Sequence, residues 1–352
     1  MSSVRAISGL RPSRPDARGR VTRFEYRSQR LAECNPLDDP TTREVFVYLP
    51  PGHDDHQGRY PVLFSLAAYT SSGPAQVGWR NHGENLPQRL DRLIADGALA
   101  PVVVVMPDTF TALGGNQFVD SPALGDYASH LALELVPEID RRFKTIPEPA
   151  ARGLFGKSSG GFGALHLATR FPATFGGVAC HAGDCGFDRV YQRDFVTCCD
   201  ELARFDGDAE AFAADFWRAR KPPGRAFHAL MTLCLAASYS PAPGRPLNLE
   251  LPFDLETARL DEAVWERWLA LDPVRYDAAR LESLAALRAL WIDAGSRDQY
   301  FIHYGTRELA RRLADAGVAR HHEEFDGTHS GLDWRFDRSL PWLVDRLLQD
   351  RG

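Results

Sequence analysis

The feature that most constrains the fold is a short glycine-rich segment, GKSSG at residues 156–160, which has the pattern G-x-S-x-G. An apolar run at residues 153–155 precedes it, and a stretch rich in small residues, 159–170, follows it. This order predicts a buried strand, a sharp turn at Ser158 and then a helix. A serine on such a turn has a strained backbone, and small neighbours let the strand and the helix approach each other. The segment therefore predicts an α/β sheet with Ser158 at the end of a strand.

Ser158 is the candidate nucleophile. The N-terminus of the helix that follows would stabilise negative charge beside it. The neighbouring Ser159 lacks the flanking glycines, and we expect its backbone N–H to be the first donor of an oxyanion hole. A turn that serves only packing, or a phosphate-binding loop, is the alternative interpretation of short glycine patterns. The sequence has no G-x-x-x-x-G-K-[ST] segment, which argues against the phosphate loop.

Around this segment, compact apolar runs alternate with helix-like stretches, which is typical of a mostly parallel sheet with helices on both faces. The pattern predicts a doubly wound α/β sheet of about eight strands. We expect its strands at residues 21–28, 43–50, 60–68, 100–108, 152–156, 176–183, 287–295 and 320–327.

The alternation stops between residues 184 and 281, where an aromatic and Arg-rich stretch is broken by two proline-containing segments. We interpret about residues 186–280 as a helical cap inserted into one catalytic domain of residues 21–352. Residues 1–20, rich in Arg, Ser, Pro and Gly, are expected to form an extended arm.

The order of the strands also predicts a base and an acid. When the nucleophile lies on this kind of turn, the acid follows a late strand and the histidine follows the last one. His329 lies just past the run 320–327, between glycines that let the loop bend. Asp298 lies in the loop after the run 287–295, where it could accept a hydrogen bond from His329. Asp293, still inside that run, is the rival acid.

The second oxyanion donor should come from the loop after the run 60–68, and we expect it to be the backbone N–H of Tyr69. Small residues before Tyr69 would permit a close approach, although an ordinary Ser/Gly loop is the alternative. Substrate-binding candidates are Trp79, Asn116, Gln117 and His181, with the cap aromatics as a further source of contacts.

Composition excludes several classes of protein and partner. A net charge of −6 provides no basic field for nucleic acid, and no stretch approaches the roughly 18 apolar residues that span a bilayer. We therefore expect a cytoplasmic protein whose partner is a small molecule. The sequence is also compatible with a homo-oligomer. The six cysteines match neither a disulfide framework nor a repeated zinc-ligand spacing. No metal and no cofactor are expected.

With these residues placed, the chain resembles the Putative esterase family of α/β-hydrolases, which includes esterase D (S-formylglutathione hydrolase), the enterochelin esterases and the mycolyltransferases. The resemblance covers about residues 42–342, apart from most of the cap. It rests on PVLFSLAAYTSSG, VVVMPDTF, LGDYASHLALELVPEIDRRF, GKSSGGFGALHLATRFP, HAGD, IDAGSRDQY and DGTHSGLDW.

The resemblance implies an α/β-hydrolase fold with a helical cap, a triad of Ser158, Asp298 and His329, and an oxyanion N–H at Tyr69. Esterase D relatives carry a cysteine about where Ser71 stands here and lack so long an insertion, which argues against a formylglutathione substrate. The expected activity is cleavage of a carboxylic ester or thioester through an acyl-enzyme. An acyltransferase with the same triad, or a non-catalytic binding module on this fold, is the alternative.

Overall fold

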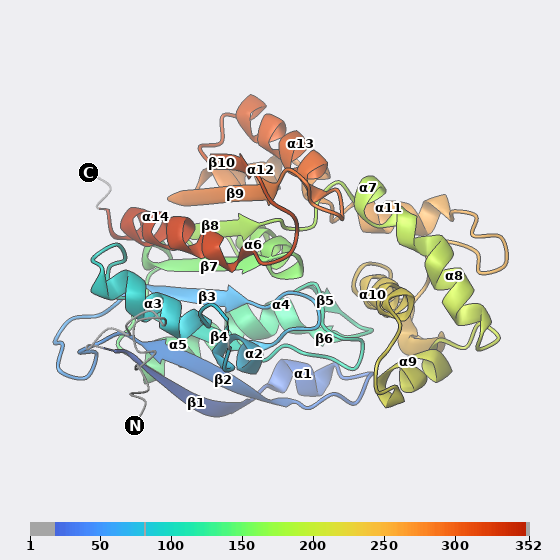
Figure 1. Cartoon of the computed structure of the whole chain (residues 1–352), viewed down its shortest axis with the longest axis horizontal. Helices are drawn as coiled ribbons and strands as arrows, with labels where there is room; N and C mark the ends of the chain where they lie inside the picture. Colours follow the sequence, from blue (N-terminus) through green and yellow to red (C-terminus); the bar gives the residue numbers. More distant parts are fainter. Residues whose placement is uncertain (1–17, 81, 350–352) are drawn as a thin grey trace, which may run out of the picture.

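A twisted sheet of eight strands forms the centre of the computed structural model, which describes residues 18–80 and 82–349. The strands are ordered β1-β2-β4-β3-β7-β8-β9-β10 (Figure 1). β1 and β4 both pair antiparallel with β2, and all pairs from β4 to β10 are parallel. The predicted mostly parallel sheet is therefore confirmed. The strands are β1 Arg20–Arg27, β2 Thr42–Leu49, β3 Val62–Leu66, β4 Val103–Pro107, β7 Arg152–Lys157, β8 Gly177–His181, β9 Ala289–Gly295 and β10 His321–Phe325.

Of the predicted arm, residues 1–17 lie outside the described residues, and β1 already begins at Arg20. A separate hairpin of β5 (Asp120–Ser121) and β6 (Gly125–Asp126) lies outside the large sheet.

The strands bury alternate side chains on the two faces of the sheet, because successive side chains of a strand point in opposite directions. On one face, Leu63 and Phe155 pack under α3 (Leu86–Ala95) and α14 (Phe336–Leu348). On the other face, Phe64 and Leu154 belong to a second cluster with residues of the remaining sheet-covering helices. These helices are α5 Val136–Arg142, α6 Ser159–Arg170, α12 Ala278–Ala285 and α13 Ile302–Asp315.

The chain between β8 and β9, residues 182–288, is mostly helical and is called the β8–β9 segment below. Figure 1 shows its helices α8 to α11 beyond the ends of the central strands, to the side of the sheet. Among the residues that the structure describes, no helix is both long and apolar enough to cross a membrane. The helices of this segment before α12 are α7 Phe187–Val190, α8 Phe195–Ala203, α9 Ala209–Arg218, α10 Gly224–Tyr239 and α11 Glu262–Leu269.

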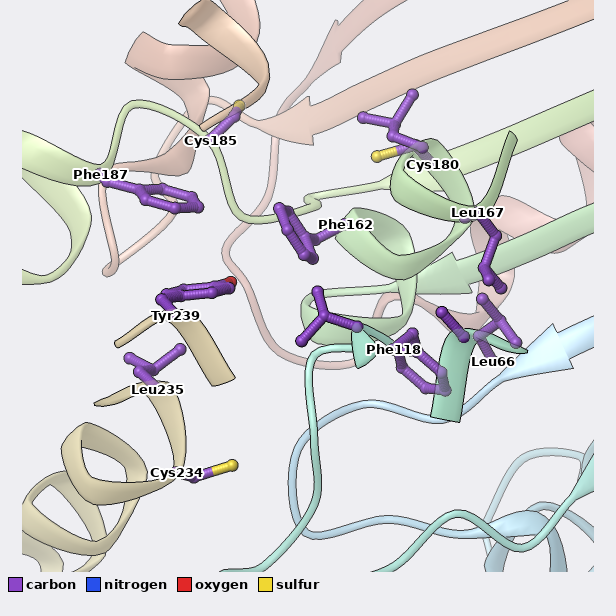
Figure 2. Close-up of a cluster of buried hydrophobic side chains, with 14 of the residues drawn as sticks. Leu66, Phe118, Phe162, Leu167, Cys180, Cys185, Phe187, Cys234, Leu235 and Tyr239 are labelled. Carbon is purple, nitrogen blue, oxygen red and sulfur yellow. The ribbon is translucent and has the colours of Figure 1, made fainter. Parts of the chain in front are cut away.

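The β8–β9 segment shares its hydrophobic core with the sheet. Figure 2 shows Phe162 of α6 facing Phe187 and Tyr239, which come from α7 and α10. The ring centroid of Phe162 lies 5.9 Å from that of Phe187 and 5.8 Å from that of Tyr239, within the range of aromatic pairing. The segment is therefore packed directly on the helix that follows Ser158.

Candidate active site

Ser158 occupies a strained turn between β7 and α6. Its φ is 55° and its ψ is −128°, a conformation that is costly for a residue with a side chain. The turn depends on two glycines: a Cβ at Gly156 would lie 2.5 Å from the Gly160 backbone, and one at Gly160 would lie 2.2 Å from the Leu66 carbonyl oxygen. The glycines of the G-x-S-x-G pattern thus let β7, β3 and α6 meet closely at Ser158.

The loops after β9 and β10 run side by side. The N–H of Ser296 donates to the Phe325 carbonyl (2.8 Å), and that of Arg297 donates to the Gly327 carbonyl (2.9 Å). A side chain at Gly295 would collide with Gly327, since a Cβ there would lie 2.5 Å from its carbonyl oxygen. Neighbouring parallel strands place their carboxyl ends at the same edge, so two loops distant in sequence come together.

These loops bring Asp298 and His329 into contact. His329 Nδ1 lies 2.7 Å from Asp298 Oδ2, and the Asp298 side chain is fully buried. The other oxygen, Oδ1, accepts the backbone N–H of Tyr300 at 2.8 Å. Gln299 Oε1 accepts the backbone N–H of His329 at 2.9 Å. A second hydrogen bond therefore fixes the Asp298 carboxylate, and the backbone of His329 is held by Gln299.

A cavity of about 310 Å³ opens between these elements. Ser158 and His329 both line it, and the β8–β9 segment contributes its far wall. The rest of the lining is mostly aromatic or apolar, which suits the hydrocarbon part of a small molecule. The lining residues are Ala68, Tyr69, Lys157, Ser158, Ser159, Asp184, Val190, Tyr191, Phe227, Met231, Tyr300, Ile302, His329, Ser330 and Gly331.

The two residues expected to supply oxyanion N–H groups, Tyr69 and Ser159, both line this cavity. Ser159 is the first residue of α6, where backbone N–H groups have no partner within the helix. Two hydrogen bonds to the loop after β4 hold the Tyr69 loop in place. The Thr70 N–H donates to the Gly114 carbonyl (2.8 Å), and the Tyr69 hydroxyl donates to the Leu113 carbonyl (2.9 Å). The long loop after β4 thus supports Tyr69.

The four substrate-binding candidates lie outside the cavity lining. The side chain of Gln117 contacts a lining residue, because its Nε2 donates to Ser159 Oγ at 3.0 Å from a buried position. Asn116 braces its own loop by donating to the Thr109 carbonyl and accepting the Phe118 N–H, each at 2.7 Å. Trp79 is 65% exposed in the segment after α2 (Gly73–Val77).

The side chain of His181 points toward α14 and does not line the cavity. Its ring lies 2.8 Å from Asp293 Oδ1 and 2.9 Å from Ser339 Oγ of α14, with no exposed surface. Asp293, the rival acid, also accepts hydrogen bonds from Arg335 (2.9 Å) and Trp291 (2.8 Å). Burial alone would raise the pKa of Asp293, but His181 and the Arg335 guanidinium outweigh it and hold that pKa below its usual value. Asp293 is therefore committed to a buried network away from His329.

Asp184 is a cavity residue that was not among the candidates from the sequence. It follows β8 by three residues, is only 6% exposed, and its Oδ2 accepts the Tyr191 hydroxyl at 2.9 Å. Burial raises the pKa of its carboxyl group to about 6. The HAGD turn after β8 was the available signal, because ligands gather beyond the carboxyl ends of parallel strands.

Within the described residues, no group of three or more His, Cys, Asp or Glu side chains is arranged to hold a metal ion. Cys180, Cys185, Cys198 and Cys199 are buried free thiols, and burial raises the pKa of each.

The chain resembles known esterases in sequence. An esterase of Mycobacterium tuberculosis is 31% identical over 259 residues, which cover 70% of this chain and 46% of that protein. A Xylanibacter ruminicola protein named endo-1,4-beta-xylanase/feruloyl esterase is 31% identical over 144 residues, covering 37% of this chain and 18% of that protein. The chain spans less than half the length of either relative.

Solved structures are similar over almost the whole chain. A ferulic acid esterase has a TM-score of 0.60 at 19% identity and covers 94% of this chain and 100% of its own. An S-formylglutathione hydrolase from Agrobacterium tumefaciens has a TM-score of 0.55 at 17% identity, covering 94% and 96%. The predicted α/β-hydrolase fold is therefore confirmed. The family model described as Putative esterase matches residues 40–339. By its fold and by this match, the chain belongs to the Putative esterase family.

Proposed function

We propose that this protein is a serine hydrolase that cleaves a carboxylic ester or thioester through an acyl-enzyme. One observation carries the proposal: a single cavity is lined by Ser158, on its strained turn, and by His329, whose Nδ1 is hydrogen-bonded to the buried Asp298. A nucleophile, a base and a group that orients the base are the parts that acyl transfer needs.

In the proposed mechanism, His329 is the general base. Its Nδ1–H donates to the Asp298 carboxylate, which leaves Nε2 free to take the proton from Ser158 Oγ. The serine oxygen attacks the carbonyl carbon, and the resulting oxyanion accepts hydrogen bonds from the backbone N–H groups of Ser159 and Tyr69. Asp298 stabilises the imidazolium that forms and keeps the ring oriented.

The tetrahedral intermediate then collapses and breaks the bond to the alcohol or thiol, which leaves with the proton from His329 Nε2. Water enters, His329 removes its proton, and attack on the acyl-enzyme releases the carboxylic acid and restores Ser158. Every step uses groups of this chain and water. The proposal is supported by the family membership and by the sequence relatives, which are named as esterases.

Labelling with a fluorophosphonate probe, followed by mass measurement of the intact protein, tests the nucleophile. We expect one label on the native chain and none on Ser158→Ala, with turnover of p-nitrophenyl acetate and butyrate reduced at least about 10³-fold in Ser158→Ala and His329→Ala. Ser283→Ala and His56→Ala are matched controls, because both residues lie outside the cavity lining.

Native protein that neither takes the label nor turns over either ester would overturn the proposal in favour of a binding module. If labelling occurs, adding an alcohol acceptor separates hydrolysis from acyl transfer: a hydrolase releases the free acid, whereas a transferase forms the new ester in preference. Predominant formation of the new ester at low acceptor concentration would contradict the hydrolase assignment.

A further inference from the structure

A carboxylate without a cationic partner lines the same cavity as Ser158. The chain leaves β8 through Ala182, whose φ is 42°, and this turn brings Asp184 from the sheet edge into the cavity wall. Within residues 18–80 and 82–349, Asp184 forms no ion pair, and the Tyr191 hydroxyl is the one donor to its carboxylate. Since that bond uses Oδ2, Oδ1 remains available to a group inside the cavity.

Among the described residues, no Lys or Arg side chain is paired with the Asp184 carboxylate. Lys157 also lines the cavity, but its ammonium group is paired with Asp333, which lies outside the cavity lining. Much of the remaining wall is apolar, with Val190, Phe227 and Met231 among its residues. A buried carboxylate with a single neutral donor is costly to the free protein, and a ligand that supplies another donor removes part of that cost.

We propose that Asp184 is the anchor of a recognition subsite, at which its free oxygen accepts a hydrogen bond from a hydroxyl or ammonium group on the acyl part of the substrate. The inference rests on the proposed function and deepens it by naming a substrate class. That class comprises esters or thioesters whose acyl group has an apolar body and a hydrogen-bond donor. A buried acceptor discriminates strongly against an analogue that lacks the donor, because the acceptor is then left unpaired.

The acyl group is the part that needs such an anchor. It stays bound to Ser158 through both chemical steps, whereas the alcohol or thiol leaves after the first. An anchor on the acyl side therefore orients the substrate for acylation and also holds the acyl-enzyme for attack by water.

The subsite should respond to pH. Burial raises the pKa of Asp184 to about 6, while the Tyr191 hydroxyl and His329 oppose that rise. The carboxylate is therefore ionised above about pH 6 and protonated below it, and preference for a donor falls as the pH falls through that value. The ionisable groups that face or couple to it are Tyr191, Tyr239, Tyr300, Cys180, Cys185, Asp272, Asp298 and His329.

The test compares p-nitrophenyl esters that differ only at the end of the acyl chain. For a shorter chain the set is butanoate, 3-hydroxypropanoate and 3-aminopropanoate; for a longer one it is heptanoate, 6-hydroxyhexanoate and 6-aminohexanoate. The readout is the ratio of kcat/KM for the donor-bearing ester to kcat/KM for its methyl-terminated partner. Because both esters of a pair use the same Ser158 and His329, a change that affects only the shared catalytic steps cancels in this ratio.

We expect the ratio in native enzyme to exceed 1 for at least one pair, and Asp184→Asn to lower it at least about tenfold if the donor is ammonium. For a hydroxyl donor the kcat/KM ratio should fall less, by about threefold or more, since the Asn carbonyl still accepts a hydrogen bond. Asp215→Asn is the matched control: it removes the same charge from an exposed position on α9, outside the cavity lining. It should leave the ratio unchanged.

If Asp184→Asn does not fold, the pH dependence of the ratio in native enzyme decides. A ratio that declines as the pH falls from about 8 to 5 supports the subsite, and a flat ratio overturns it. The absence of any donor preference, or a preference that survives in folded Asp184→Asn, also overturns it. In each of these cases Ser158 still takes the fluorophosphonate label and methyl-terminated esters are still cleaved, whereas loss of both would overturn the proposed function itself.

Discussion

Ser158 holds a backbone conformation with a positive φ of 55°, which glycine adopts at little cost. We therefore expect Ser158→Gly to be more stable than Ser158→Ala by about 1 kcal/mol, because relief of strain exceeds the extra entropy glycine has in the unfolded chain. Urea unfolding of the two inactive variants measures the difference. Equal midpoints and slopes would mean that the turn stores no strain at this residue.

Asp293 and Asp298 form hydrogen bonds with different partners, Arg335 and His329 respectively. Removing Asp293 leaves Arg335 buried with one fewer counter-charge, so Asp293→Ala should lower the free energy of unfolding by about 3 kcal/mol. Removing Asp298 frees the His329 ring, so Asp298→Ala should lower kcat about 10⁴-fold at a smaller cost in stability. Unfolding curves and kcat/KM measured on both variants check this division. The reverse pattern would make Asp293 the acid of the triad.

At the scale of elements, Asp272 joins the two ends of the β8–β9 segment. Its carboxylate accepts the backbone N–H groups of Gly186, Phe187 and Val274 at 2.9, 2.7 and 3.1 Å, and it is 1% exposed. Asp272→Ala leaves these N–H groups without an acceptor, so we expect a loss of about 3 kcal/mol. Hydrogen exchange should speed up most in α7 and in residues 273–275.

Asp277→Ala is the control for Asp272→Ala. Asp277 caps α12 from an exposed position by accepting the Arg280 N–H at 2.9 Å, and its loss should cost about 1 kcal/mol. Equal destabilisation by the two variants, or unchanged hydrogen exchange in α7, would show that Asp272 does not join the two ends of the β8–β9 segment.

At the scale of the whole molecule, one hydrophobic cluster runs from the sheet into the β8–β9 segment through Phe162, Phe187 and Tyr239 (Figure 2). Continuous packing of this kind couples the two parts, so we expect them to unfold in one transition. Far-ultraviolet circular dichroism and tryptophan fluorescence should give coincident curves, since Trp265 and Trp268 lie in the segment and Trp291 lies in β9. A fluorescence change at lower denaturant than the loss of the sheet would contradict this.

The sequence by itself determined the order of the elements and the positions of the main candidates. Periodicity located the strands of the sheet, because a strand buried on both faces needs a continuous apolar run. The glycines around Ser158 predicted the turn, since only small residues fit where β7 and α6 converge. Asp298 and His329 could be chosen by position alone, because parallel strands bring their carboxyl ends to one edge.

Only the tertiary structure decided which side chains face the cavity. His181 and Asp184 are three residues apart, yet His181 packs against α14 while Asp184 lines the cavity with Ser158. A strand's periodicity tells which of its residues share a face, but not which face a distant helix covers. The opposite assignments of Asp293 and Asp298 depend likewise on Arg335 and His329, which come from segments that meet them only in the folded chain. Contacts between residues far apart in sequence are set by packing, and packing is a property of the whole fold.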